Sequence, residues 1–263
     1  MPDQSPISSW SVQTPLTKSQ YDQYKAAGID YLHAQLLYNR GITSPTAMLR
    51  FLDARFDQLP DPFLLNDMDR AVERTRRALD GAEHITVYGD FDADGVTSAA
   101  LLTRALRNLK QPGAQLDYFI PHRLEHTRGL SSEALDSIAP RGTSLLITTD
   151  CGSSDAAEVA YARTLGIDVI ITDHHQPPDQ TLPDCPVINP WRPDNTYPER
   201  HLCGAGIAFK FAQALLKSYG REAEVHELLD LAAIGSISDV ALMSGENHTL
   251  VRLGIEPVSY THL

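Results

Sequence analysis

Three aspartates occupy alternate positions in one short stretch of the chain, VYGDFDADGVTSAALL: Asp90, Asp92 and Asp94. Three negative charges at this spacing repel one another, and without a neighbouring cation burial would raise their pKa values and lower stability. A divalent cation compensates them, because carboxylate oxygens are ligands that Mg²⁺ and Mn²⁺ prefer. The stretch therefore indicates a cation site, although taken alone it is equally typical of a solvated turn.

The same residue types recur in TTDCGSSD and VIITDHH, which contribute Asp150, His174 and His175. Oxygen ligands mixed with imidazole, and no thiolate, favour Mn²⁺ or Mg²⁺ over zinc or copper. Asp239, in AAIGSISDV, is a later candidate that would by itself be read as a surface-turn residue. Together these residues predict a phosphoesterase centre with two divalent metal ions. The alternative is a structural or fortuitous cluster, which would not need so many ligands in one crevice.

The sequence pattern around these residues predicts the strands and helices of an α/β fold. Short apolar runs alternate with longer amphipathic runs, a pattern typical of a parallel sheet covered by helices on both faces. The strands are expected at 84–89, 116–120, 144–149, 168–172 and 186–189, and the helices at 95–109, 131–139, 155–165, 204–219 and 222–234. The last helix is expected to break at Gly235. Because ligands bind at the carboxyl ends of parallel strands, Asp90, Asp150 and Asp173 with the two histidines should face one crevice.

The other segments are expected to precede and follow this domain along the sequence. Residues 1–20 are predicted to be a loosely ordered arm, 21–80 a helical lead-in in which Ser44 and Pro45 begin a helix, 81–256 the α/β domain, and 257–263 an unmatched tail.

Composition excludes several classes of protein. The 263 residues are 42% hydrophobic and 21% charged, as in an ordinary globular protein. No apolar run approaches the length of a membrane span and no signal peptide is evident, so a cytoplasmic location and no membrane partner are expected. Three cysteines without CxxC spacing indicate neither a disulfide framework nor a zinc site. The net charge of −12 argues against broad attraction to nucleic acid unless bound cations cancel part of it.

Six stretches together resemble the DHH phosphoesterase superfamily, and most closely its RecJ-type single-stranded-DNA-specific exonucleases. They are YGDFDADGVTSAALL, TTDCGSSD, VIITDHH, VINP, LCGAGIAFKF and AAIGSISDV, and the likeness covers about residues 30–256. The small phosphodiesterases and pyrophosphatases of the superfamily resemble one another in a His four residues before the first Asp of their DxD. Here that position is Tyr88, and the additional Asp90 matches the RecJ branch.

The resemblance implies a role for each matching position. Metal ligands would be Asp90 (as ligand or orienting residue), Asp92, Asp94, Asp150, His174 and Asp239, with Asp150 as the bridge. His175 would face the scissile phosphate and act with Asp150 in catalysis. Arg123, Lys210 and the backbone N–H groups of Gly204 and Gly206 would hold phosphate.

The resemblance also implies an activity. Water activated by the two cations would cleave the phosphodiester bond, without a protein nucleophile. The expected function is 5′ to 3′ exonuclease action on single-stranded DNA in DNA repair and recombination, with single-stranded DNA as partner and a single-strand-binding protein or helicase as further partners. Tyr118, Phe119, Trp191 and Tyr197 could stack on bases, although each is more often core or rim.

The chain departs from the RecJ pattern in two places. HTRGLS has Thr127 and Arg128 where the family has Gly and Tyr, and the chain ends where the family continues into a second lobe and an OB-fold. A truncated form is therefore expected, with basic DNA-binding surfaces in the missing part. Two alternatives remain open: a small DHH phosphoesterase acting on oligo- or dinucleotides, which Tyr88 counts against, and a non-catalytic DHH binding module, which the retained aspartates and histidines count against.

Overall fold

The computed structural model describes residues 11–123, 129–177 and 182–258, so the HTRGLS departure at Thr127 and Arg128 lies outside the described residues. The chain divides into two compact units, with the division after Ala54. In the described part no helix has both the length and the apolar composition that crossing a bilayer requires.

The first unit consists of three helices, α1 (Lys18–Ala26), α2 (Tyr31–Asn39) and α3 (Pro45–Asp53). Helix α3 begins as predicted, because the Ser44 side chain accepts a hydrogen bond from the third helical residue and Pro45 takes the first position. Helix α1 begins inside the expected arm, where the Thr17 side chain caps it. The buried side chains of Tyr24, Leu37 and Met48 form the small core of this unit.

The second unit contains the predicted parallel sheet, in the order β2-β1-β3-β4-β5. The strands are β1 (His84–Gly89), β2 (Gln115–Phe119), β3 (Leu145–Thr149), β4 (Asp168–Thr172) and β5 (Val187–Ile188). Their register aligns Gly89, Thr149 and Thr172 in one row across the three central strands. The residues that follow them, Asp90, Asp150 and Asp173, therefore leave the sheet side by side.

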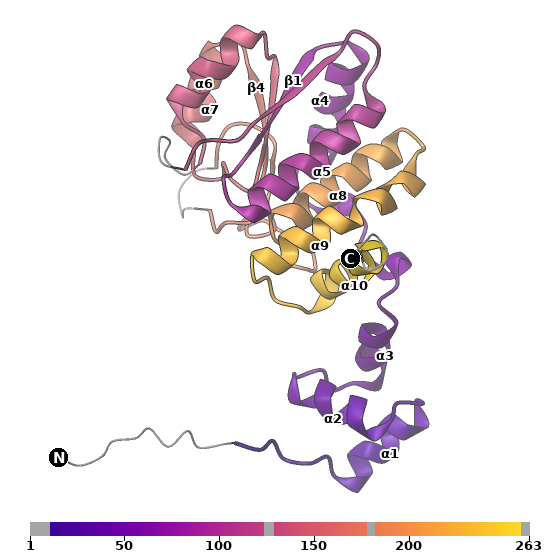
Figure 1. Ribbon diagram of the computed structural model, residues 1–263. Helices are drawn as coiled ribbons and strands as arrows, with labels where there is room; N and C mark the ends of the chain where they lie inside the picture. Colours follow the sequence, from indigo (N-terminus) through magenta and orange to yellow (C-terminus); the bar gives the residue numbers. More distant parts are fainter. Residues whose placement is uncertain (1–10, 124–128, 178–181, 259–263) are drawn as a thin grey trace, which may run out of the picture. The chain divides into compact units, whose positions relative to one another are not determined.

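Helices cover both faces of the sheet, as Figure 1 shows. One face is covered by α4 (Met68–Asp80), α5 (Ala93–Leu109) and α8 (Gly204–Ser218); α9 (Leu229–Ser238) packs against α5 and α8, and α10 (Gly245–Val258) packs against α9. The opposite face is covered by α6 (Ser132–Ile138) and α7 (Ala156–Thr164). Four short 3₁₀ helices complete the described elements: η1 (Phe56–Gln58), η2 (Pro62–Leu64), η3 (Ala139–Arg141) and η4 (Glu222–Leu228).

The two cores explain why the strands read as continuous apolar runs. Along β3, Leu145 and Ile147 are buried in the core beneath α5 and α8, whereas Leu146 is buried in the core beneath α6 and α7. Successive side chains of a strand point to opposite faces, so a strand that is covered twice has no polar positions. The predicted α/β fold with helices on both faces is confirmed.

Most predicted bounds are shifted by one or two residues, and two differences are larger. The expected helix 222–234 is instead η4 followed by α9, which continues through Gly235 to Ser238. A Cβ at Gly235 would overlap the Cβ of Ala205, so this glycine permits close helix packing rather than a break. Helix α4 also packs into the core of the second unit, through Met68, Ala71 and Leu79. The compact unit around the sheet therefore begins at Arg55, not after residue 80.

Candidate metal centre

The turn between β1 and α5 holds three of the predicted ligands in place. Asp92 caps α5, because its Oδ1 accepts a hydrogen bond of 3.0 Å from the N–H of Gly95. A Cβ at Gly95 would lie 2.5 Å from the carbonyl oxygen of Asp90, so only glycine lets the helix start this close to the strand end. This close approach brings Asp90, Asp92 and Asp94 together at the carboxyl edge of the sheet.

Asp94 is oriented by the first turn of α8. The N–H groups of Gly204 and Ala205 donate to its two carboxylate oxygens at 2.7 and 2.8 Å. Burial raises the pKa of Asp94, and the two backbone hydrogen bonds together with His174 oppose that effect. A helix N-terminus favours a carboxylate in this position.

These contacts correct the prediction that the Gly204–Gly206 turn holds phosphate. The N–H of Gly204 is used by Asp94, and the N–H of Gly206 donates to Cys203 Sγ at 3.4 Å. The turn instead positions an acidic side chain. The sequence could not show this, because the donors and the acceptor are more than a hundred positions apart.

Asp150 follows β3 and lies at the centre of the cluster. Its backbone has φ +65°, a left-handed conformation that is uncommon outside glycine and often occurs at functional sites. The side chain is 1% exposed. Of the described residues only His174 offers a donor, with its Nε2 2.9 Å from Oδ1, and Oδ2 has no hydrogen-bond partner. A Cβ at Gly204 would lie 2.6 Å from the Cβ of Asp150. A buried carboxylate with so few donors fits a cation ligand.

His174 lies between the carboxylates. Its Nε2 is 2.9 Å from Asp150 Oδ1 and 3.8 Å from Asp94 Oδ2, and its Nδ1 is 3.9 Å from Asp239 Oδ2. Asp239 reaches the cluster from the residue that follows α9. The structure thus brings together all six predicted metal ligands.

Three overlapping groups of side chains could each hold a cation, with ligand atoms within 4.8 Å of one another. They are Asp150, His174 and His175; Asp94, His174 and Asp239; and Asp90, Asp92 and Asp150. Asp150 and His174 each belong to two groups, so neighbouring cation positions would share a ligand. This arrangement fits two hard divalent cations, since the described donors are oxygen and imidazole.

Asp173, which the strand pattern places at the crevice without a role of its own, organises the DHH segment. Its Oδ1 accepts from the N–H of His174 at 2.8 Å and of His175 at 3.1 Å, and lies 2.8 Å from His175 Nδ1; its Oδ2 accepts from the N–H of Ser153 at 3.0 Å. Burial opposes ionisation of Asp173, but these hydrogen bonds outweigh it and lower the pKa of the carboxyl. Asp173 also raises the pKa of His175. Its role is to fix the ring and backbone of both histidines.

The two remaining predicted phosphate-binding residues, Arg123 and Lys210, differ from each other in their surroundings. Arg123 is exposed after β2, with its guanidinium 5.5 Å from the ring centroid of Phe91, the residue between Asp90 and Asp92. Lys210 is fully buried, with its Nζ 2.8 Å from Glu246 Oε1 and 2.6 Å from the carbonyl oxygen of Pro60. The prediction for Lys210 is therefore wrong, because its charge is paired inside the protein.

The protonation of the cluster predicts how cation binding depends on pH. Burial, and then the neighbouring carboxylates, raise the pKa of Asp150. Burial disfavours the charge on His174, but Asp150, Asp94 and Asp239 outweigh it and raise the pKa of His174 to about 9. A cation needs ionised Asp150 and neutral His174, so protons compete with it throughout the range below pH 9.

We therefore expect the dissociation constant for Mn²⁺ to fall as pH rises from 7 to 9, by up to about tenfold per pH unit for each displaced proton. Isothermal titration calorimetry in two buffers of different ionisation enthalpy would measure both the affinity and the protons released. A dissociation constant that stays level across this range, with no proton release, would contradict the assignment of these two ligands.

Comparison with known proteins agrees with this geometry. Residues 84–236 match the model of the DHH family, N-terminal domain. The chain is 39% identical over 254 residues to the single-stranded-DNA-specific exonuclease RecJ of Bacillus subtilis, and 40% identical over 205 residues to that of Escherichia coli. These alignments cover 96% and 74% of this chain, but only 31% and 35% of the relatives. The chain thus spans about a third of the length of these relatives.

Two solved structures are similar to the fold. A crystal structure of exonuclease RecJ bound to manganese has a TM-score of 0.67 and 35% identity, covering 78% of this chain and 54% of the other. RecJ from Thermus thermophilus in complex with Mn²⁺ has a TM-score of 0.76 and 32% identity, covering 94% of this chain and 34% of the other. The matched residues include every strand of the sheet and five of the six clustered candidate ligands. The sixth, Asp239, lies three residues beyond the match. The chain therefore belongs to the DHH family.

Proposed function

We propose that this chain carries the metal centre of a phosphodiesterase that removes nucleotides from single-stranded DNA in the 5′ to 3′ direction, as part of DNA repair and recombination. The observation that carries the proposal is Asp150, a buried carboxylate that has only His174 beside it as a possible donor and that belongs to two of the three candidate ligand groups. The likeness to RecJ proteins named as single-stranded-DNA-specific exonucleases supports the substrate and the exonuclease action.

The chain's own residues would each contribute to the reaction. Asp90, Asp92, Asp94, Asp150, His174 and Asp239 would hold two Mn²⁺ or Mg²⁺ ions. When bound, the cations would supply an activated water and neutralise the charge that develops on the phosphate. Gly204 and Asp173 act as positioning residues for Asp94 and for the histidines. His175 and exposed Arg123 would contact the phosphate.

The environment of Tyr88 favours this reading over a small phosphodiesterase. Its side chain is fully buried and its hydroxyl donates to the carbonyl oxygen of Gly129 at 2.8 Å. Burial raises the pKa of Tyr88 far above its usual range, so its phenol stays neutral and is a poor metal ligand. The position that carries a His in the small phosphodiesterases therefore belongs to the core in this chain.

We expect Mn²⁺-dependent release of mononucleotides from single-stranded DNA, with much slower release from the matching duplex. The assay follows an oligonucleotide labelled at its 5′ end and a second labelled at its 3′ end, each with and without EDTA. A 5′ to 3′ enzyme frees the 5′ label first as a mononucleotide. Hydrolysis of a dinucleotide alone would favour the small phosphoesterase, and Mn²⁺ binding without hydrolysis of any substrate would favour a binding module.

A further inference from the structure

A groove of ≈ 470 Å³ lies between α5 and the edge strand β2. Its α5 wall includes Val96, Ala100, Thr103 and Arg107, whose spacing places them on one face of the helix. This wall begins two residues after Asp94. At about 1.5 Å per residue, Arg107 lies about 20 Å from Asp94 along the helix axis. The groove therefore runs along α5 from the end of the helix that carries Asp94, and its wall changes from apolar to basic.

The β2 wall of the groove presents an aromatic ring to solvent. Tyr118 is 62% exposed, and Val96 opposite it in the lining is 43% exposed. Among the described residues no hydrogen bond or ring contact to Tyr118 occurs, whereas the neighbouring Phe119 stacks on Tyr88. An exposed aromatic ring beside small apolar side chains is a surface on which a nucleobase can stack.

The two arginines of the groove are available to an anion. Arg104 is 45% exposed, and its nearest carboxylate, on Glu227, is 3.7 Å away. Arg107 is exposed and makes no ion pair with any described residue. In a chain with net charge −12, these two guanidinium groups on one face of α5 give the groove a local positive charge.

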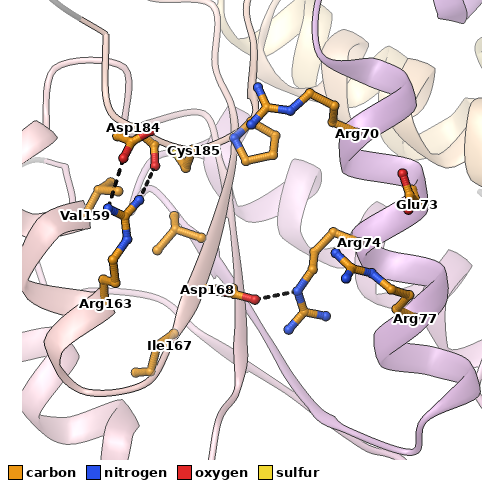
Figure 2. Close-up of a pocket in the computed structure, with 12 residues that line it drawn as sticks. Arg70, Glu73, Arg74, Arg77, Val159, Arg163, Ile167, Asp168, Asp184 and Cys185 are labelled. Carbon is orange, nitrogen blue, oxygen red and sulfur yellow. Dashed lines mark hydrogen bonds and ion pairs between the residues drawn. The ribbon is translucent and has the colours of Figure 1, made fainter.

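A second hollow, of ≈ 330 Å³, shows the contrast (Figure 2). It lies between α4 and α7, at the amino end of β4, and four arginines line it. Arg74 pairs with Asp168 at 2.6 Å, and Arg163 pairs with Asp184 at 2.9 Å. Arg70 pairs with Asp67 at 2.8 Å. Carboxylates of the protein thus neutralise three of the four arginines, so this hollow offers a phosphate less than the groove does.

We propose that the groove between α5 and β2 binds the part of a single strand that lies beyond the nucleotides at the metal centre. A base stacks on Tyr118 while its phosphates pair with Arg104 and Arg107. This inference rests on the proposed function, because it takes the strand to start at the metal centre. It places a contact with single-stranded DNA on the second unit of this chain, in addition to the metal centre.

The test separates long substrates from short ones. The 263-residue chain is assayed in Mn²⁺ with the dinucleotide dTdT and with a twelve-nucleotide oligothymidylate, and the affinity for the longer strand is measured by fluorescence anisotropy in Ca²⁺. Tyr118→Ala is expected to raise both the KM and the Kd for the longer strand about tenfold, as loss of one stacked base does. The kcat and KM for the dinucleotide should stay unchanged, because in this proposal the groove binds only nucleotides beyond those at the metal centre.

Arg107→Ser tests the phosphate contact separately. It should weaken binding of the longer strand about threefold and lower the salt dependence of log Kd by about one. Arg107 lies in the last turn of α5, where it also stabilises the helix dipole; that role alone would lower Tm without any effect of substrate length. Arg163→Ser, an exposed arginine on α7 across the sheet, is the matched control and should change neither quantity.

The outcomes distinguish this inference from the proposed function. If Tyr118→Ala leaves the longer strand unaffected, or impairs both substrates equally, the groove is not the path of the strand and fits a protein contact instead. If the wild-type chain hydrolyses neither substrate, the proposed function fails, yet the anisotropy measurement still decides whether the groove binds single strands.

Discussion

Asp150→Asn is expected to abolish tight Mn²⁺ binding and to lower kcat/KM by about 10³-fold or more, since even partners outside the metal ligands contribute about 10–100-fold. Asn keeps the shape of the side chain but removes the charge that two cation positions would share. Calorimetric titration with Mn²⁺ and the single-strand assay measure the two effects.

The same substitution should leave the metal-free protein as stable as the wild type or more stable. Burial raises the pKa of Asp150, so its ionised form destabilises the folded state increasingly as pH rises through that pKa. At pH 8 the neutral Asn avoids this cost. The mutant should therefore show an equal or higher Tm in EDTA and no increase in Tm when Mn²⁺ is added.

The control for Asp150 is Asp69→Asn, which changes an exposed carboxylate on α4. It should retain both Mn²⁺ binding and hydrolysis. An Asp150→Asn protein that still binds Mn²⁺ as the wild type does would remove Asp150 from the site, and a large loss of Tm in EDTA would show that its role is in folding.

Lys210→Met is expected to destabilise the protein by about 3–5 kcal/mol, as removal of one partner of a buried ion pair does. The ammonium group lies 2.8 Å from Glu246 Oε1, and both side chains are fully buried. Tyr197 donates to the other oxygen of Glu246 at 2.5 Å. Without Lys210, the carboxylate on α10 would remain buried without its counter-charge. Urea unfolding followed by circular dichroism measures the loss.

The double substitution Lys210→Met with Glu246→Gln is the matched control, because it removes both charges and should recover much of the lost stability. Below the unfolding transition, Lys210→Met should bind single-stranded DNA and Mn²⁺ as the wild type does. A single mutant with unchanged stability but weaker DNA binding would instead support a phosphate-binding role for Lys210.

The local pattern of the chain was sufficient to predict the sheet and most of its helices. The predicted bounds of β1 and β4 agree with the structure, because a strand buried on both faces needs a continuous apolar run that local sequence displays. The expected helix break at Gly235 was wrong, because there tertiary packing and not the local sequence decides the structure. Low helix propensity is a local property, and the close packing of α9 against Ala205 outweighs it.

The sequence by itself placed Asp90, Asp150 and His174 at one edge of the sheet, since each follows a strand whose end the apolar pattern marks. Only the tertiary structure decided what surrounds them: the N–H groups at the start of α8 face Asp94, Asp173 orients His175, and Lys210 points to Glu246 rather than to a substrate. Ligand type and strand position are encoded locally, whereas hydrogen-bond partners and burial depend on residues that folding brings together from distant parts of the chain.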